Sequence, residues 1–244
     1  MKEIRWPNPL YLVYIVCALI TLTIVYLWFS PTGRHVSGST GGQLAVVPPK
    51  SLPIAPPEHR SPQTAGRAHI GIVAGHLGFD SGAVCPDGLT EQSINASVAN
   101  LVLEKLKDIG VEADLLEEFD VALQDYTATA LVSIHSDSCI YPEATGFKVA
   151  SLEGSANPEN QILVNCLVEH YGERTGLPYH QNSITYDMTQ YHAFTDINSK
   201  TAGAIIEIGF MLADREKLTG EQEVVAQGIF EGIQCYLEDW KQRR

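Results

Sequence analysis

HIGIVAGHLGFDSGAVCPDGLTE, from His69 to Glu91, is the stretch around which the rest of the chain is arranged. It begins with the apolar run Ile70–Ala74, which is β-branched and too short for a helix, so we expect a buried strand. A glycine-rich loop with His76 at its start follows this strand, and a helical pattern begins at Glu91. Ligands of open α/β sheets bind outside the carboxyl ends of the strands, so this loop can bring His76 and Glu91 to one point.

Downstream of this stretch, short apolar runs alternate with helical patterns. The first helix, from Glu91 to about Ile109, has an apolar stripe at helical spacing, with Thr90 as its N-cap and Gly110 as its stop. We expect further strands at 111–116, 130–134, 146–151 and 202–208, helices at 157–175 and 221–240, and only loops and short elements at 177–199. This order predicts a three-layer α/β sandwich with a mainly parallel sheet, folded as one domain over residues 68–244.

The chain before residue 68 contains two segments of different composition, one apolar and one rich in proline. Residues 10–29, LYLVYIVCALITLTIVYLWF, are an uncharged apolar run long enough to span about 30 Å of hydrocarbon as a helix. We expect a transmembrane signal-anchor there, with residues 1–9 as a short cytoplasmic N-terminus, and hence a single-pass protein of the cell membrane with an extracytoplasmic domain. The alternative is a cleaved signal peptide, although the run is long and ends on Trp28 and Phe29. Residues 30–67, rich in Pro, Gly, Ser and Thr, predict a disordered linker.

Composition limits the partners. The 244 residues carry a formal net charge of −13, and an acidic surface repels phosphate groups, so we expect no nucleic-acid partner. The five cysteines are scattered without a CxxC motif, which excludes a cysteine-rich zinc site. We interpret most of them as small buried residues and not as a disulfide framework. The sequence identifies no protein regulator.

Four polar residues stand out by their place in this pattern. His76 and His135 each end a predicted strand, and Glu91 opens a helix. Two imidazoles and one carboxylate form a ligand set for catalytic zinc that leaves a fourth position open. Glu207 lies inside an apolar strand, where an unpartnered carboxylate is costly, and it is placed to accept a proton from water. A single histidine at a strand end is more often structural, so the prediction depends on all four residues together.

Three short motifs contain these residues: AGHLGFDSGA at 74–83, VSIHSD at 132–137 and IIEIGF at 205–210. They resemble the motifs GHGGxDxGA, SIHxN and ExGF of the zinc-dependent N-acetylmuramoyl-L-alanine amidases of the AmiC/CwlV type. The resemblance covers residues 68–244. It implies one zinc ion held by His76, Glu91 and His135, with Glu207 as the catalytic carboxylate. It also implies the substrate, which is the amide between the lactyl group of muramic acid and L-alanine in peptidoglycan.

The chain departs from the family pattern at several positions. Leu77 stands where a glycine is usual, Asp137 replaces an asparagine, and Cys85 occupies a loop position usually held by glycine. The segment 117–130 lacks the usual TR and its later arginine. These departures concern contacts with substrate more than the metal site. A disulfide involving Cys85 or Cys139, or a thiolate near the metal, stays open.

Two other functions are compatible with the pattern. A zinc hydrolase of the same fold that acts on a different amide or peptide would keep the four site residues. A degenerate domain that only binds the cell wall would have no need to keep Glu207 in an apolar strand. Among the remaining polar residues, Asp80 either orients His76 or forms an Asx-turn, and we interpret His192 as an ordinary surface histidine.

Overall fold

The computed structural model describes residues 67–244. The expected cytoplasmic N-terminus (1–9), the signal-anchor (10–29) and the linker up to residue 66 lie outside the described residues. Among the helices of the described part, none has both the length and the apolar composition needed to cross a bilayer.

A five-stranded mixed sheet forms the middle layer, in the order β2-β1-β3-β5-β4. The strands are β1 (His69–Ala74), β2 (Glu112–Leu116), β3 (Ala130–Asp137), β4 (Lys148–Ala150) and β5 (Ala202–Phe210). Strand β1 pairs in parallel with β2 and β3, and β3 pairs in parallel with β5, whereas β4 runs antiparallel to β5. The predicted α/β fold with a mainly parallel sheet is therefore confirmed, with one antiparallel strand at an edge.

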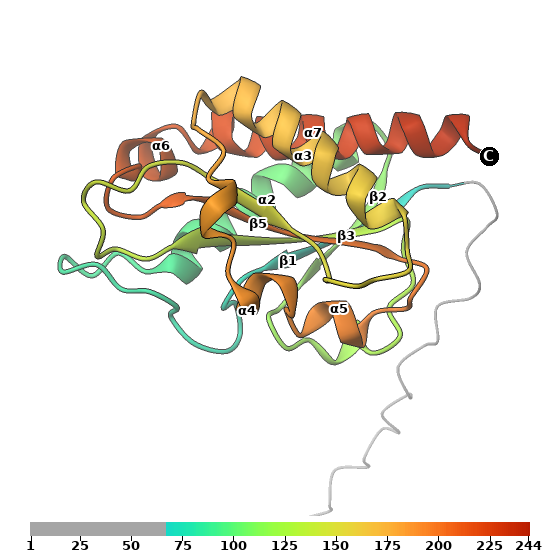
Figure 1. The fold of residues 1–244 in the computed structure, drawn as a ribbon, viewed down its shortest axis with the longest axis horizontal. Coiled ribbons are helices and arrows are strands. Elements are labelled where there is room, and N and C mark those ends of the chain that lie inside the picture. Colours follow the sequence, from blue (N-terminus) through green and yellow to red (C-terminus); the bar gives the residue numbers. More distant parts are fainter. Residues whose placement is uncertain (1–66) are drawn as a thin grey trace, which may run out of the picture. The chain divides into compact units, whose positions relative to one another are not determined.

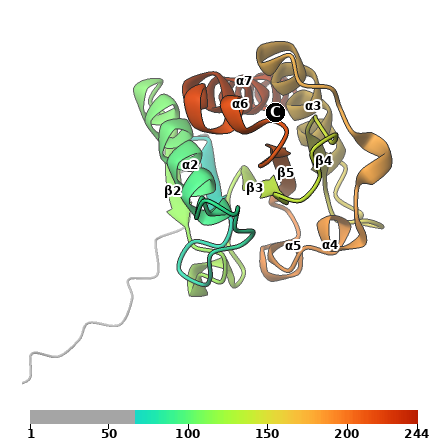
Figure 2. The ribbon, with the colours of Figure 1, turned by 90° about the vertical axis from the view of Figure 1, so that its left-hand side faces the viewer.

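Helices cover both faces of the sheet, but unequally (Figures 1 and 2). One face carries the long helices α2 (Glu91–Asp108), α3 (Glu159–Thr175) and α7 (Gln222–Gln242). Within residues 67–244, the opposite face carries only short elements: η1 (Val121–Leu123), α4 (Tyr186–Thr189) and α5 (Ala193–Asp196). Two further short helices, η2 (Gln181–Ser183) and α6 (Arg215–Gly220), complete the described elements. The region 177–199, predicted as loops and short elements, thus forms most of a thin third layer.

Alternation of side chains along β3 shows how the sequence separates these layers. Ala130, Val132 and Ile134 are buried under the long helices, whereas Leu131 belongs to the core of the thin layer. Successive strand residues point to opposite faces, so His135 lies on the same side as Leu131. The contact of its ring with Tyr191, at 5.5 Å between centroids, agrees with this placement. His135 therefore sits at the carboxyl end of a central strand, facing the thin layer.

The cysteines correct a prediction. Four of them, expected to be small buried thiols, form the disulfides Cys85–Cys139 and Cys166–Cys235. The first joins the loop after β1 to the segment after β3, and the second joins α3 to α7. The paired residues are 54 and 69 positions apart, so they become neighbours only when these elements pack. No local spacing in the sequence indicates that pairing.

Candidate functional site

The loop after β1 places His76 on a left-handed backbone with φ 67°, which is uncommon for a residue other than glycine. Asp80 stabilises this turn. Its Oδ1 accepts a hydrogen bond from the Gly82 N–H at 2.9 Å and lies 2.6 Å from Nδ1 of His76. Asp80 thus performs both roles that the sequence left open, the Asx-turn and the orientation of the imidazole, and it leaves Nε2 of His76 to face the site.

Glu91 is the first residue of α2, and its carboxylate is held by several donors. The Thr90 hydroxyl caps the helix by accepting the Ser93 N–H at 3.2 Å. Oε2 of Glu91 accepts the N–H of Ala83 at 3.1 Å, and Oε1 accepts the N–H of Ser136 at 3.2 Å. These bonds connect the loop, the helix and the end of β3, so the position of the carboxylate is defined by three separate segments.

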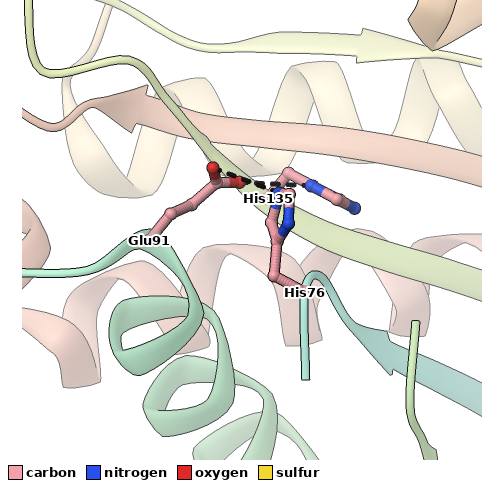
Figure 3. A group of neighbouring side chains, drawn as sticks. All are labelled: His76, Glu91 and His135. Carbon is pink, nitrogen blue, oxygen red and sulfur yellow. Dashed lines mark hydrogen bonds and ion pairs between the residues drawn. The ribbon is translucent and has the colours of Figure 1, made fainter. Parts of the chain in front are cut away.

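His76, Glu91 and His135 converge at the carboxyl edge of the sheet (Figure 3). Nε2 of His76 is 3.2 Å from Oε2 of Glu91, and Nδ1 of His135 is 3.2 Å from Oε1 of the same carboxylate. One ligand atom from each residue lies within 4.8 Å of the other two. Tetrahedral zinc with bonds of 2.0–2.1 Å separates its ligand atoms by about 3.4 Å. The three residues therefore fit a zinc site in donor type and in spacing.

Two glycines of the first motif allow this close approach. A Cβ atom on Gly75 would lie 2.5 Å from the ring of His135. A Cβ atom on Gly82 would lie 2.6 Å from Oε2 of Glu91 and 2.7 Å from Cδ2 of His76. A side chain at either position would displace one of the three residues, which explains why glycine is needed at both.

Ionisation in the cluster is strongly coupled. Burial opposes the charge on Glu91, but hydrogen bonds with His135 and His76 outweigh it and hold the pKa of Glu91 well below its ordinary value. Burial likewise opposes the charge on His135, yet interactions with Glu118 and Glu91 raise its pKa to about 10. A cation that binds here must displace the proton from His135, so we expect metal binding to release protons.

Glu207 lies beside this cluster on β5. In the sheet register it pairs with His135 of β3 on one side and with Lys148 of β4 on the other. Its Oε2 is buried and has no hydrogen-bond partner among residues 67–244. Burial raises its pKa to about 7, with the charge of His135 opposing the shift and the charge of Glu91 adding to it. Glu207 is therefore a carboxylate that can exchange a proton near neutral pH.

Glu118, a buried carboxylate two residues beyond the end of β2, was not predicted from the sequence as a site residue. Its Oε2 accepts the backbone N–H of His76 at 2.8 Å and lies 3.4 Å from Nε2 of His135. Its Oε1 accepts the Tyr191 hydroxyl at 3.0 Å and lies 3.0 Å from Nε2 of His192. The position of Glu118 after a parallel strand, at the edge where His76 and His135 also lie, was a signal that could have identified it.

Two residues in this neighbourhood have contacts that the sequence did not indicate. His192 was expected to be an ordinary surface histidine, but it contacts the buried Glu118 and stacks on Phe119 at 4.3 Å between ring centroids. Asp137, which replaces the usual asparagine of the family, forms an ion pair with the buried Lys148. That pair lies next to Glu207, because Lys148 is the β4 partner of Glu207.

Known proteins resemble this chain in sequence and in fold. Residues 70–235 match the family model Amidase_3, described as N-acetylmuramoyl-L-alanine amidase. YqiI of Bacillus subtilis (strain 168), an uncharacterized protein, is 28% identical over 210 residues, which are 77% of this chain and 93% of that protein.

Solved structures of amidases are also similar to this chain in fold. The catalytic domain of the amidase CwlV from Bacillus (Paenibacillus) polymyxa var. colistinus is 26% identical with a TM-score of 0.57, over 70% of this chain and 98% of that domain. The amidase AmiC2 of Nostoc punctiforme shares the fold, with 23% identity and a TM-score of 0.54 over 71% of this chain and 98% of that one. The family model spans most of the chain and includes all four predicted site residues, so this chain belongs to the N-acetylmuramoyl-L-alanine amidase family of hydrolases.

Proposed function

We propose that this protein is a zinc-dependent amidase that hydrolyses the amide between the lactyl group of muramic acid and L-alanine in peptidoglycan. One observation carries the proposal: His76, Glu91 and His135 converge with the spacing of zinc ligands in a chain of the amidase family. These three residues would hold one zinc ion. When bound, zinc supplies Lewis-acid chemistry, polarising the amide carbonyl and acidifying water.

Glu207 is the proposed proton carrier of the reaction. It accepts one proton from the attacking water and delivers it to the nitrogen of L-alanine as the C–N bond breaks. The water oxygen ends in the carboxylate of the lactyl group, and the leaving amine keeps the proton. In the metal-free protein burial raises the pKa of Glu207 to about 7, which shows that its surroundings favour the protonated form and suit it to take up a proton and return it.

We also propose that residues 10–29 hold the protein in the cell membrane, with residues 68–244 outside the cytoplasm. The two disulfides of the described domain support this location, because disulfides persist in oxidising compartments and are rare in the cytosol. Peptidoglycan, the proposed substrate, would then lie within reach of a domain carried on a proline-rich linker.

The test is digestion of purified muropeptides by the full-length protein, with free stem peptide measured by mass spectrometry. We expect release of stem peptide by the parent and at least about a hundredfold slower release by Glu207→Gln, which keeps the three zinc ligands. Metal analysis of both proteins should find one zinc per chain.

Three results would contradict the proposal in different ways. A zinc-loaded parent that releases no stem peptide would show that the substrate is another amide. A parent without bound zinc would reject the metal site. A Glu207→Gln variant with near-parental activity would show that another residue moves the proton.

A further inference from the structure

The two proposed imidazole ligands differ in how their second nitrogen is held. Nδ1 of His76 is 2.6 Å from Oδ1 of Asp80, so Asp80 accounts for the nitrogen that faces away from Glu91. Nε2 of His135 is the equivalent nitrogen of the second imidazole. It is buried and lacks a hydrogen-bond partner among the described residues, but Oε2 of Glu118 lies only 3.4 Å away.

We propose that Glu118 is the positioning residue of the metal site, which keeps the Nε2–H tautomer of His135 so that Nδ1 presents its lone pair to zinc. This inference rests on the proposed zinc site. A metal-ligating histidine usually donates its other ring N–H to a carboxylate or carbonyl, which fixes both the tautomer and the ring orientation. Glu118 would thus do for His135 what Asp80 does for His76.

Glu118 is itself held from three directions, which gives it the rigidity that this role requires. The Tyr191 hydroxyl and Nε2 of His192 hold Oε1, both at 3.0 Å. The backbone N–H of His76 donates to Oε2 at 2.8 Å. That last bond also supports the left-handed conformation of His76, so one carboxylate contacts both proposed imidazole ligands.

The contacts of Glu118 differ from those of the three proposed zinc ligands. The carboxylate of Glu91 lies 3.2 Å from Nε2 of His76 and 3.2 Å from Nδ1 of His135, whereas Glu118 lies near Nε2 of His135, on the opposite side of that ring. A buried imidazole N–H without an acceptor is costly. Closing the 3.4 Å gap to Glu118 is therefore the expected response of the ring when Nδ1 binds a cation.

The experiment measures zinc affinity of the full-length protein by competition with a chromophoric chelator. We expect Glu118→Ala to weaken zinc binding about 10- to 100-fold, as loss of such orienting partners typically does. Glu118→Gln keeps an acceptor oxygen and should recover most of that loss. Glu117→Gln is the matched control, because it removes the same charge from the adjacent, exposed residue and should leave the affinity unchanged.

A second measurement does not depend on whether Glu118→Ala folds. In the zinc-loaded parent and in Glu118→Gln, nitrogen NMR of the histidine rings should show His135 protonated at Nε2 and metal-bound at Nδ1. Zinc on Nε2, or an affinity of Glu118→Ala within twofold of the parent, would overturn the inference. If Glu118→Ala does not fold, the tautomer in the parent and in Glu118→Gln decides.

Failure of this inference can be told apart from failure of the proposed function. A parent that binds zinc and cleaves muropeptides, with an affinity insensitive to Glu118, would reject only the positioning role. A parent that binds no zinc would reject the metal site and this inference together.

Discussion

Glu207 differs from the other carboxylates of the site in its hydrogen bonding. Glu91 and Glu118 each accept bonds from backbone or side-chain donors, which compensate their burial. Oε2 of Glu207 has no such donor within the described part of the chain. An uncompensated carboxylate favours its neutral form, which is the physical reason that the three residues titrate differently within one site.

This difference predicts a pH dependence of stability in the metal-free protein. Burial raises the pKa of Glu207 from 4.5 to about 7, while His135, Glu91, Asp137 and Lys148 face it with charges of both signs. The folded state therefore holds a proton that the unfolded state has lost between these two pH values. Stability from this group falls as pH rises through that window, by about 3 kcal/mol in all.

The comparison is urea unfolding of the chelator-treated parent and of Glu207→Gln at pH 5 and pH 8. Glutamine does not titrate, so the variant should gain about 3 kcal/mol relative to the parent between the two pH values. A stability difference between the two proteins that is the same at both pH values would show that Glu207 does not carry a raised pKa.

At the scale of the elements, close packing constrains the conformation of the loop between β1 and α2 as much as its hydrogen bonds do. Gly75→Ala should push the ring of His135 out of place, because the new Cβ would lie 2.5 Å from it. We expect zinc affinity to fall by at least about tenfold, comparable to the loss of an orienting partner. Gly220→Ala is the control, since a Cβ there meets nothing within 4 Å, and its zinc affinity should match the parent. Equal affinities in the two variants would contradict the steric argument.

At the scale of the whole molecule, the two disulfides make a matched pair. They close loops of similar length, with separations of 54 and 69 residues, so chain entropy predicts that each stabilises the fold by about 4 kcal/mol. Their places in the fold differ. Cys166–Cys235 joins two helices far along the chain from the metal ligands, whereas Cys85–Cys139 joins the two segments that carry the three proposed ligands.

Removing either bridge should therefore lower stability, but the two removals should differ in their effect on zinc binding. The double variants Cys85→Ala/Cys139→Ala and Cys166→Ala/Cys235→Ala should both lower the free energy of unfolding. Only the first should also weaken zinc binding, because it frees the ligand-bearing segments to move apart. Chelator competition and urea unfolding on both variants provide the check, and identical zinc affinities would mean that the first bridge has no part in shaping the site.

Much of the fold followed from local sequence patterns. The apolar run before His76 predicted β1, and the helical stripe after Thr90 predicted α2, with Ile94, Val98 and Leu106 buried as expected. The end of that stripe was predicted less well, because Ile109 is about half exposed at the C-cap of the helix. Helix ends depend on what packs beyond them, and a periodic pattern contains no such information.

The sequence by itself determined the order of strands and helices, and it placed His76 and His135 at strand ends, Glu91 at a helix start and Glu207 within a strand. Apolar periodicity, glycine positions and caps are local properties, so they can be seen without a structure. Only the tertiary structure decided the cysteine pairing, the antiparallel edge strand and the role of Glu118. These features depend on contacts between distant segments, such as those of His76 and Glu118, which are 42 positions apart, and packing alone brings such residues together.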